Sequence, residues 1–184
     1  MATKTATKPT SKPAAKKQVM QIYRASDRRP SESDASSEKI LPMSAETQAG
    51  FARLVEAGVM DGAMVKTLFD IPGFKLTYCW FKAHYPLPRH SHKQDCLYYI
   101  VKGDIKLGTE KLGPGDGFFL PDGTPYTYDI GAEGAEVLEI RTNGDSNFKA
   151  FNYSAKWWDK AEKACRDNHE AWVKAEPPRP ARSA

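Results

Sequence analysis

Two histidines one residue apart are the side chains of this sequence best placed to do chemistry. His90 and His92 lie thirteen and eleven residues before Gly103. Side chains alternate between the two faces of a β-strand, so residues spaced by two point the same way. Two imidazoles on one face can bind one transition-metal ion. The pair therefore predicts a site for one divalent metal, with Fe(II) as the first expectation and Mn, Ni, Cu or Zn as alternatives.

Two segments around this pair resemble the motifs of the cupin superfamily. Residues 88–103 resemble the first motif, in which a His-x-His pair precedes a glutamate, six further residues and a glycine. Residues 115–126 resemble the second motif, with Gly115, Pro121 and Gly123 at matching spacings. With the strands around the motifs, the resemblance covers residues 62–142. It implies a small, single-domain, RmlC-like cupin: a double-stranded β-helix, or jelly-roll barrel, that holds a metal ion.

Two positions depart from the cupin pattern, and both bear on the metal. Cys96 stands where the glutamate ligand is expected; its side chain is shorter, although a thiolate bonds zinc at about 2.3 Å. Tyr126 stands where the last histidine is expected, and its longer phenol could bind the metal or lie beside a substrate. Gln94 has the strand parity of the histidines, and Tyr98 has that of Cys96. The expected metal ligands are His90, His92, Gln94 and Cys96, and the expected catalytic residues are Tyr126 and Tyr98.

Cysteine at the glutamate position also occurs in thiol dioxygenases, which are cupin enzymes with an iron held by three histidines. Cys96, with six residues to Gly103, looks like that variant. The second motif ends in Tyr126, so a third histidine would have to come from His84 or His169. The resemblance to these enzymes is therefore partial.

Runs rich in β-branched and aromatic residues predict strands, and clusters of Gly, Pro and Asp predict turns between them. Short strands at near-regular spacing indicate an antiparallel sandwich or barrel, so the expected fold is an all-β jelly roll. Glu139 and Arg141 share one face of the last run, where we expect a structural ion pair outside the site. The predicted strands cover residues 74–82, 97–101, 117–120, 126–130 and 136–141.

Two helices are expected to flank the barrel, one on its N-terminal and one on its C-terminal side. Ser44 can cap the first, which ends near Gly58, and Ser154 can cap the second. Their apolar faces would pack over the barrel or against a partner subunit, and the expected assembly is a homodimer. These faces hold Phe51, Leu54 and Val55 in the first helix, and Trp158, Ala161, Cys165 and Trp172 in the second.

Length and charge set the organisation of the chain. A chain of 184 residues is one domain with tails. The first 17 residues hold five lysines and no acidic residue, so the formal net charge of +4 leaves −1 on the remainder. We therefore expect no specific nucleic-acid binding, although the tail could touch polyanions or act as a transit peptide. The expected organisation is a disordered tail at 1–38, one cupin domain at 39–175 and a disordered tail at 176–184.

Cysteine usage and hydropathy bear on the compartment. Three cysteines without Cys-x-x-Cys spacing argue against a disulfide framework or a structural zinc site and favour a reducing compartment. No apolar run approaches the roughly 20 residues of a membrane helix, and no signal-peptide core is present. We expect a cytoplasmic protein without membrane contact.

Two functions fit these residues. The first is a mononuclear metal-dependent enzyme, of oxygenase or of lyase or isomerase type, acting on a small organic molecule. Two histidines and a weak third donor would leave metal positions open for the substrate. The second is a cupin that binds a small ligand without turnover and has a degenerate metal site, because one fold hosts many functions. The intact His-x-His pair favours the enzyme.

Deletion of residues 1–35 should leave the melting temperature within about 2 °C of the parent value. A segment so poor in apolar residues cannot offset its own ordering entropy. Thermal unfolding followed by circular dichroism measures the effect. A large drop would mean that the arm packs on the barrel or bridges a dimer.

Overall fold

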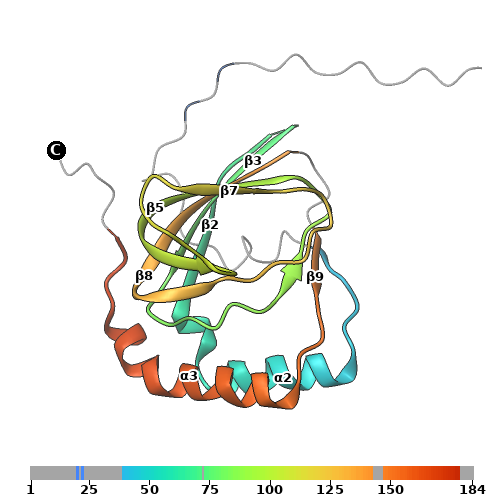
Figure 1. Cartoon of the computed structure of the whole chain (residues 1–184), viewed down its shortest axis with the longest axis vertical. Helices are drawn as coiled ribbons and strands as arrows, with labels where there is room; N and C mark the ends of the chain where they lie inside the picture. The colour runs from blue at the N-terminus through green and yellow to red at the C-terminus, as the bar shows by residue number, and fades with distance from the viewer. Residues whose placement is uncertain (1–19, 21, 23–38, 72, 143–146, 179–184) are drawn as a thin grey trace, which may run out of the picture.

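The computed structural model describes residues 20, 22, 39–71, 73–142 and 147–178, which form two β-sheets and two long helices (Figure 1). The strands are β1 (Lys39–Ile40), β2 (Ala63–Ile71), β3 (Phe74–Phe81), β4 (His90–Ser91), β5 (Cys96–Leu107), β6 (Glu110–Leu112), β7 (Gly117–Leu120), β8 (Asp129–Arg141) and β9 (Asn147–Ala150). The larger sheet has the order β2-β3-β8-β5-β6, and β7 pairs with β5. The smaller sheet has the order β1-β9-β4.

Alternation along the strands determines which side chains enter the core. In β3 every second residue from Lys75 to Phe81 is buried, and its neighbours are more exposed. In β5 the same pattern runs from Cys96 to Ile100. Burial of their apolar area is the main stabilising contribution to the sandwich. The inward apolar side chains include Cys79, Phe81, Tyr98, Ile100 and Val137.

Helices α2 (Ala45–Glu56) and α3 (Ala155–Lys174) lie along one side of the sandwich and contact each other (Figure 1). Ser44 and Ser154 accept hydrogen bonds from backbone N–H groups three residues later, at the predicted N-caps. Val55 was expected on the apolar face but is 55% exposed, because the buried stripe is narrow and centres on its neighbour Leu54. The second core beneath the helices contains Leu54, Ala57, Trp158, Cys165 and Trp172.

The predicted all-β jelly roll with flanking helices is confirmed, as a sandwich of two sheets. The smaller sheet extends beyond the predicted core of 62–142, because β9 pairs with both β1 and β4. The strand predicted at 126–130 is instead an isolated bridge at Tyr126, followed by the start of β8 at Asp129. The preceding strand β7 and the following strand β8 belong to the larger sheet, whereas Tyr126 pairs with His90 of the smaller sheet. Residues 126–130 therefore cannot form one continuous ladder.

Most of the two predicted tails lies outside the described residues. Of the tails, the structure describes only residues 20, 22 and 176–178. Of the helices in the part of the chain that is described, none is long and apolar enough to cross a membrane.

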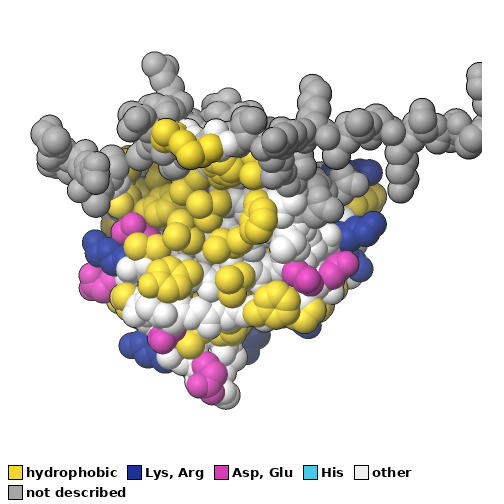
Figure 2. Space-filling view, turned by 90° about the horizontal axis from the view of Figure 1, so that it is seen from above, with side chains coloured by type: hydrophobic (Ala, Val, Ile, Leu, Met, Phe, Trp, Pro, Cys, Tyr) yellow, Lys and Arg dark blue, Asp and Glu magenta, His cyan; other side chains and the backbone are white. Residues whose placement is uncertain are grey.

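The outward face of the larger sheet carries exposed apolar side chains. Figure 2 shows hydrophobic side chains gathered on the side of the molecule away from α2 and α3. On the outward positions of β5 and β7, Leu97 and Phe119 are paired in register and are 45% and 58% exposed. Apolar patches of this kind are typical of surfaces that pack against another protein. The homodimer stays a prediction.

Gly103→Ala should destabilise the fold far more than Gly108→Ala. Both glycines have positive φ, of 75° and 62°, which costs an alanine about 1–2 kcal/mol. At Gly103 an added Cβ would also lie 1.9 Å from the carbonyl oxygen of Gly134, whereas nothing lies within 4 Å at Gly108. We expect the free energy of unfolding to fall by about 2–5 kcal/mol for Gly103→Ala and by about 1–2 kcal/mol for Gly108→Ala. Urea denaturation measures both, and equal losses would contradict the close backbone approach.

Candidate functional site

The backbone brings the two sequence motifs together. His90 lies in β4 and forms an isolated antiparallel bridge with Tyr126. The N–H of each donates to the carbonyl of the other, at 3.0 and 2.9 Å. The N–H of Gly123 donates to the carbonyl of His92 at 2.9 Å. The end of the second motif therefore lies against the histidine pair of the first.

Hydrogen bonds determine the protonation of His90. Its Nδ1 lies 2.7 Å from the carbonyl oxygen of Pro88, which can only accept, so Nδ1 carries the proton. The lone pair of Nε2 then accepts from the Tyr126 hydroxyl at 2.8 Å. Because that hydroxyl donates to His90, the Tyr98 hydroxyl donates to Tyr126, at 2.5 Å. Phe148 of β9 stacks on the imidazole at 4.8 Å. The result is one directed chain from Tyr98 through Tyr126 to His90.

His92 has the same tautomer but a different partner at Nε2. Its Nδ1 donates to the carbonyl of Asn147 at 2.9 Å. A guanidinium can only donate, so Nε2 accepts from Nη2 of Arg141, at 3.1 Å. The same Nη2 lies 2.5 Å from the carboxylate of Glu139, and the side chains of Arg141 and Glu139 are only 5% and 7% exposed. His92 is thus held between a carbonyl and a buried ion pair.

The phenols of this cluster stay protonated. Burial raises the pKa of Tyr98, Tyr126 and Tyr128 well above the ordinary tyrosine value, and the negative charge of Glu139 raises each pKa further. At neutral pH these side chains therefore act as neutral donors and acceptors.

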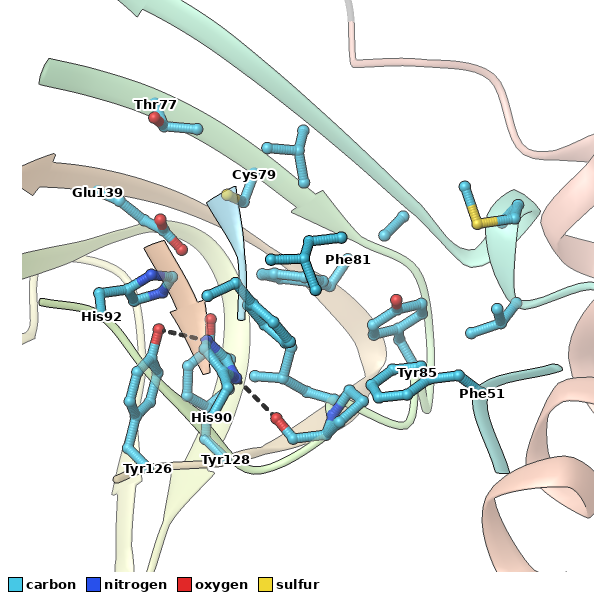
Figure 3. A pocket seen from close by; sticks show the side chains of 18 of the residues that line it. Phe51, Thr77, Cys79, Phe81, Tyr85, His90, His92, Tyr126, Tyr128 and Glu139 are labelled. Atoms are coloured by element: carbon cyan, nitrogen blue, oxygen red, sulfur yellow. Dashed lines mark hydrogen bonds between the residues drawn. The ribbon is translucent and has the colours of Figure 1, made fainter. Parts of the chain in front are cut away.

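A cavity of about 310 Å³ opens beside these residues (Figure 3). This volume lies at the lower end of the range for pockets that bind small molecules. His90, His92, Tyr126 and Glu139 gather at one end, and Phe51 and Tyr85 lie at the other. The cavity thus has a polar end inside the sandwich and an apolar end toward α2.

Two predicted metal ligands are not part of this cavity. Gln94 and Cys96 are buried, at 6% and 2% exposed, but neither lines the cavity. The Cys96 thiol donates to the backbone carbonyl of Gln94 at 3.4 Å. Cys96 is the first residue of β5 and pairs with both β7 and β8, so the ladder keeps the short side chain back from the histidines. Tyr98 also does not line the cavity and reaches it only through Tyr126.

The other two histidines lie elsewhere. His169 of α3 pairs with Asp61, with Nε2 and the carboxylate oxygen 2.9 Å apart. His84 lines a separate groove of about 450 Å³ between α3 and the segments around residues 86 and 128. Neither histidine reaches His90 and His92 to supply the third imidazole of a thiol-dioxygenase site.

The two motifs lie on two sheets, of which the larger is antiparallel and the smaller is mixed, and this placement decides the fold type. His90 starts the short strand β4 and His92 follows directly after its end, Gly103 lies close to the backbone of Gly134, and Tyr126 forms a bridge with His90. The chain has a jelly roll. The two departures from the predicted motif pattern, Cys96 and Tyr126, occupy its interior, Cys96 in the packed core and Tyr126 at the cavity.

Comparison with known proteins gives structural likeness without a sequence match. No family model matches the chain, and no curated protein matches it. Solved structures that resemble it include KdgF from a Halomonas species, at 20% identity over 44% of this chain and 78% of that one, with a TM-score of 0.41. The polyketide cyclase RemF from Streptomyces resistomycificus matches at 20% identity over 58% and 82%, with a TM-score of 0.47. An RmlC-like cupin from Shewanella frigidimarina matches at 18% identity over 46% and 78%, with a TM-score of 0.42.

One feature of the two histidines suits a metal ion, but two features of the site oppose one. Both imidazoles have Nδ1–H held by a carbonyl, as is common for metal-ligating histidines. The lone pair of His92, however, already accepts from Arg141, which is cationic at every accessible pH. Among the described residues, no three His, Cys, Asp or Glu side chains converge so that they could hold a metal ion. This donor set does not fit a resident metal.

Sequence reasoning missed five polar residues of the cavity, one of which is Thr67 of β2. Glu139 and Arg141 form the predicted ion pair, but this pair lines the cavity and contacts His92. Lys75 and Thr77 line it as well, from inward positions of β3. In the sequence, Lys75 and Thr77 visibly alternate with the outward residues of β3. Charged residues on the buried side of a strand are rare without a partner or a function, and this signal could have found them.

Tyr126→Phe should make the free energy of unfolding fall less steeply as the pH rises above neutral, because the variant has one ionisable phenol fewer. A tyrosine whose pKa is raised in the folded state loses its proton first in the unfolded state, above a pH of about 10. Stability then falls as the pH rises, by up to about 1.4 kcal/mol per pH unit for each such group. Urea denaturation at several pH values between about 9 and 11 measures this slope.

Phe118→Leu is the control for that variant, because Phe118 stacks on Tyr98 at 4.5 Å and carries no proton. It should lower stability by the same amount at every pH. An unchanged slope in Tyr126→Phe would contradict the raised pKa of this phenol.

Proposed function

We propose that this chain binds a small organic ligand inside the jelly roll and does so without a metal ion. The observation that carries the proposal is the guanidinium of Arg141, 3.1 Å from Nε2 of His92. A metal ion would need that lone pair and would meet a fixed positive charge beside it. Repulsion between two unit positive charges at 4 Å costs on the order of 4 kcal/mol in a partly desolvated site, and a divalent ion doubles it.

The cavity suits a ligand that is polar at one end. Tyr126 and His90 offer a hydroxyl and an imidazole whose hydrogen bonds are already oriented. Preorganised polar groups in an otherwise apolar pocket give a ligand its orientation at little entropic cost. The ligand's polar end would contact these groups, and its apolar part would lie toward Phe81 and Phe51.

A metal-dependent enzyme is the second candidate, and one observation favours it. Backbone carbonyls hold Nδ1–H of both histidines, so that each Nε2 is unprotonated as metal binding requires. Movement of the Arg141 guanidinium away from His92 would be needed to release the lone pair of Nε2. The two candidates therefore differ in whether the parent protein takes up a metal.

Protein purified without a metal-chelating tag should contain far less than one transition-metal ion per chain. Arg141→Gln should remove the guanidinium from the lone pair of His92, so that two imidazoles become available without a fixed positive charge beside them. We expect this variant to gain at least about tenfold in Co(II) affinity over the parent, since such donors suit this ion. Elemental analysis and the visible absorption of bound Co(II) measure the two effects.

Arg53→Gln is the matched control, because this substitution also removes a guanidinium from an ion pair. Arg53 pairs with Asp159 and Glu162 on the surface of α2 and α3, away from the two histidines. It should gain no Co(II) affinity. If the parent binds one ion per chain and loses it when His90 and His92 are both changed to alanine, the metal-free proposal is wrong and the metal-dependent enzyme takes its place.

A further inference from the structure

The outward side of the larger sheet carries a row of apolar side chains. Leu97 of β5 pairs in register with Phe119 of β7 and with Ile140 of β8. Ile140 pairs in turn with Leu76 of β3, and Leu76 pairs with Phe69 of β2. Residues paired in register point to the same side of a sheet. Because Leu97 and Phe119 are exposed, the whole row lies on the outward side.

A second apolar row lies one outward position further along the strands. In this row Tyr78 of β3 pairs with Leu138 of β8, and Leu138 pairs with Tyr99 of β5. No residue of either row belongs to the core inside the sandwich. The two rows, with the exposed side chains of Phe74 and Val101 beside them, form what we call the outer apolar face.

Strand β3 has the reverse of the pattern expected for a solvated sheet. An antiparallel sheet with one side in water normally has apolar residues inward and polar residues outward. In β3 the inward Lys75 and Thr77 alternate with the outward Leu76 and Tyr78. Strands that are apolar on their outer side are typical of sheets covered on both sides. The pattern therefore indicates that a further layer covers the outer apolar face.

The exposed apolar area is large enough for a stable interface. Phe74, Tyr99 and Phe119 are 59%, 47% and 58% exposed, so these three side chains together expose roughly 300 Å². Leu97 and Val101, at 45% and 43%, add to this area. A standard protein–protein interface buries about 800 Å² on each partner, and somewhat more than half of that area is apolar. The outer apolar face thus supplies most of the apolar area that one interface needs.

The rest of the chain has few apolar residues with which to cover this face. Within residues 1–38, large apolar side chains after Met1 occur only from Val19 to Tyr23. Met20 and Ile22 of this run are 88% and 67% exposed, so neither packs on the sheet. Residues 143–146 and 179–184 hold no large apolar side chain. The covering layer therefore comes from another molecule.

The charge of the face favours a second copy of this chain over a different protein. At the outward positions of the two rows on β3, β5, β7 and β8, none of the described residues is charged. Two copies of a strongly charged surface repel each other, whereas two copies of this face do not. Complementary charge commonly selects a different partner, and these rows carry no charge pattern for it to match. Dimers with two-fold symmetry are also the commonest oligomers of soluble proteins.

We infer that two copies of this chain associate about a two-fold axis through the outer apolar face, so that their larger sheets stack. Leu97 and Phe119 of one copy pack against the same face of its partner. This association does not depend on the proposed ligand, because the residues that line the cavity are on the inward side of the sheet.

Sedimentation equilibrium of the full chain between about 0.1 and 100 μM tests this association. The parent should sediment as a dimer over most of this range. Phe119→Lys brings two like charges into the interface and should raise the dissociation constant of the dimer about thirtyfold or more, the loss expected for a central interface side chain. The melting temperature of the parent should also rise with protein concentration, and that of the variant should not.

Val173→Lys is the matched control, because Val173 is 60% exposed, about as much as Phe119, but lies on α3. It should leave the dissociation constant unchanged. Leu97→Lys changes the residue paired with Phe119 and should dissociate the dimer as well. It carries the test if circular dichroism shows that Phe119→Lys does not fold.

The outcomes distinguish the possible covers of the face. A parent that is monomeric over the whole concentration range would overturn the inference, and a fall in its melting temperature on deletion of residues 1–35 would assign the cover to the N-terminal segment. A dimer that neither Phe119→Lys nor Leu97→Lys weakens would overturn it too. Dissociation by Val173→Lys alone would move the contact to the helices and contradict the outer apolar face as the interface.

Discussion

A guanidinium buried between a carboxylate and an imidazole constrains the whole interior of this protein. Arg141 is held by Glu139 at 2.5 Å and donates to His92 at 3.1 Å. Removing charges from water is expensive, so a buried pair is weak evidence of stability and is better explained by what it positions. Here it assigns the tautomer of His92, occupies the lone pair that a metal would use, and places a charged group in the wall of the cavity.

The hydroxyl chain on the other side of the cavity has the same preorganising role. Tyr98, Tyr126 and His90 form a directed series of hydrogen bonds that ends at the carbonyl of Pro88. Because burial keeps both phenols protonated, the direction of the series does not change near neutral pH. Phe148 covers the imidazole of His90 from β9. A ligand at the polar end therefore meets groups whose orientation is already determined, which lowers the entropic cost of binding.

The cavity also accounts for a local conflict between sequence and fold. Binary patterning would place apolar residues at every inward position of β3 and β8, yet Lys75, Thr77, Glu139 and Arg141 occupy such positions. Places where local rules fail without a stability benefit are often functional. The apolar continuation through Cys79 and Phe81 indicates that the conflict is confined to one end of the sandwich. This confinement supports the proposed ligand with one polar end.

The sequence by itself determined the features that depend on local periodicity: the all-β class, the caps at Ser44 and Ser154, and the shared face of His90 and His92. Alternation every two residues and capping act over a few positions, so they can be read from the chain. Only the tertiary structure decided which side chains meet, because strand register joins residues far apart. Register placed Lys75 opposite Arg141, and the packing of the two sheets placed Arg141 and Asn147, of the unpredicted strand β9, against His92. Those non-local contacts, and not the His-x-His pair, determine what the site can bind.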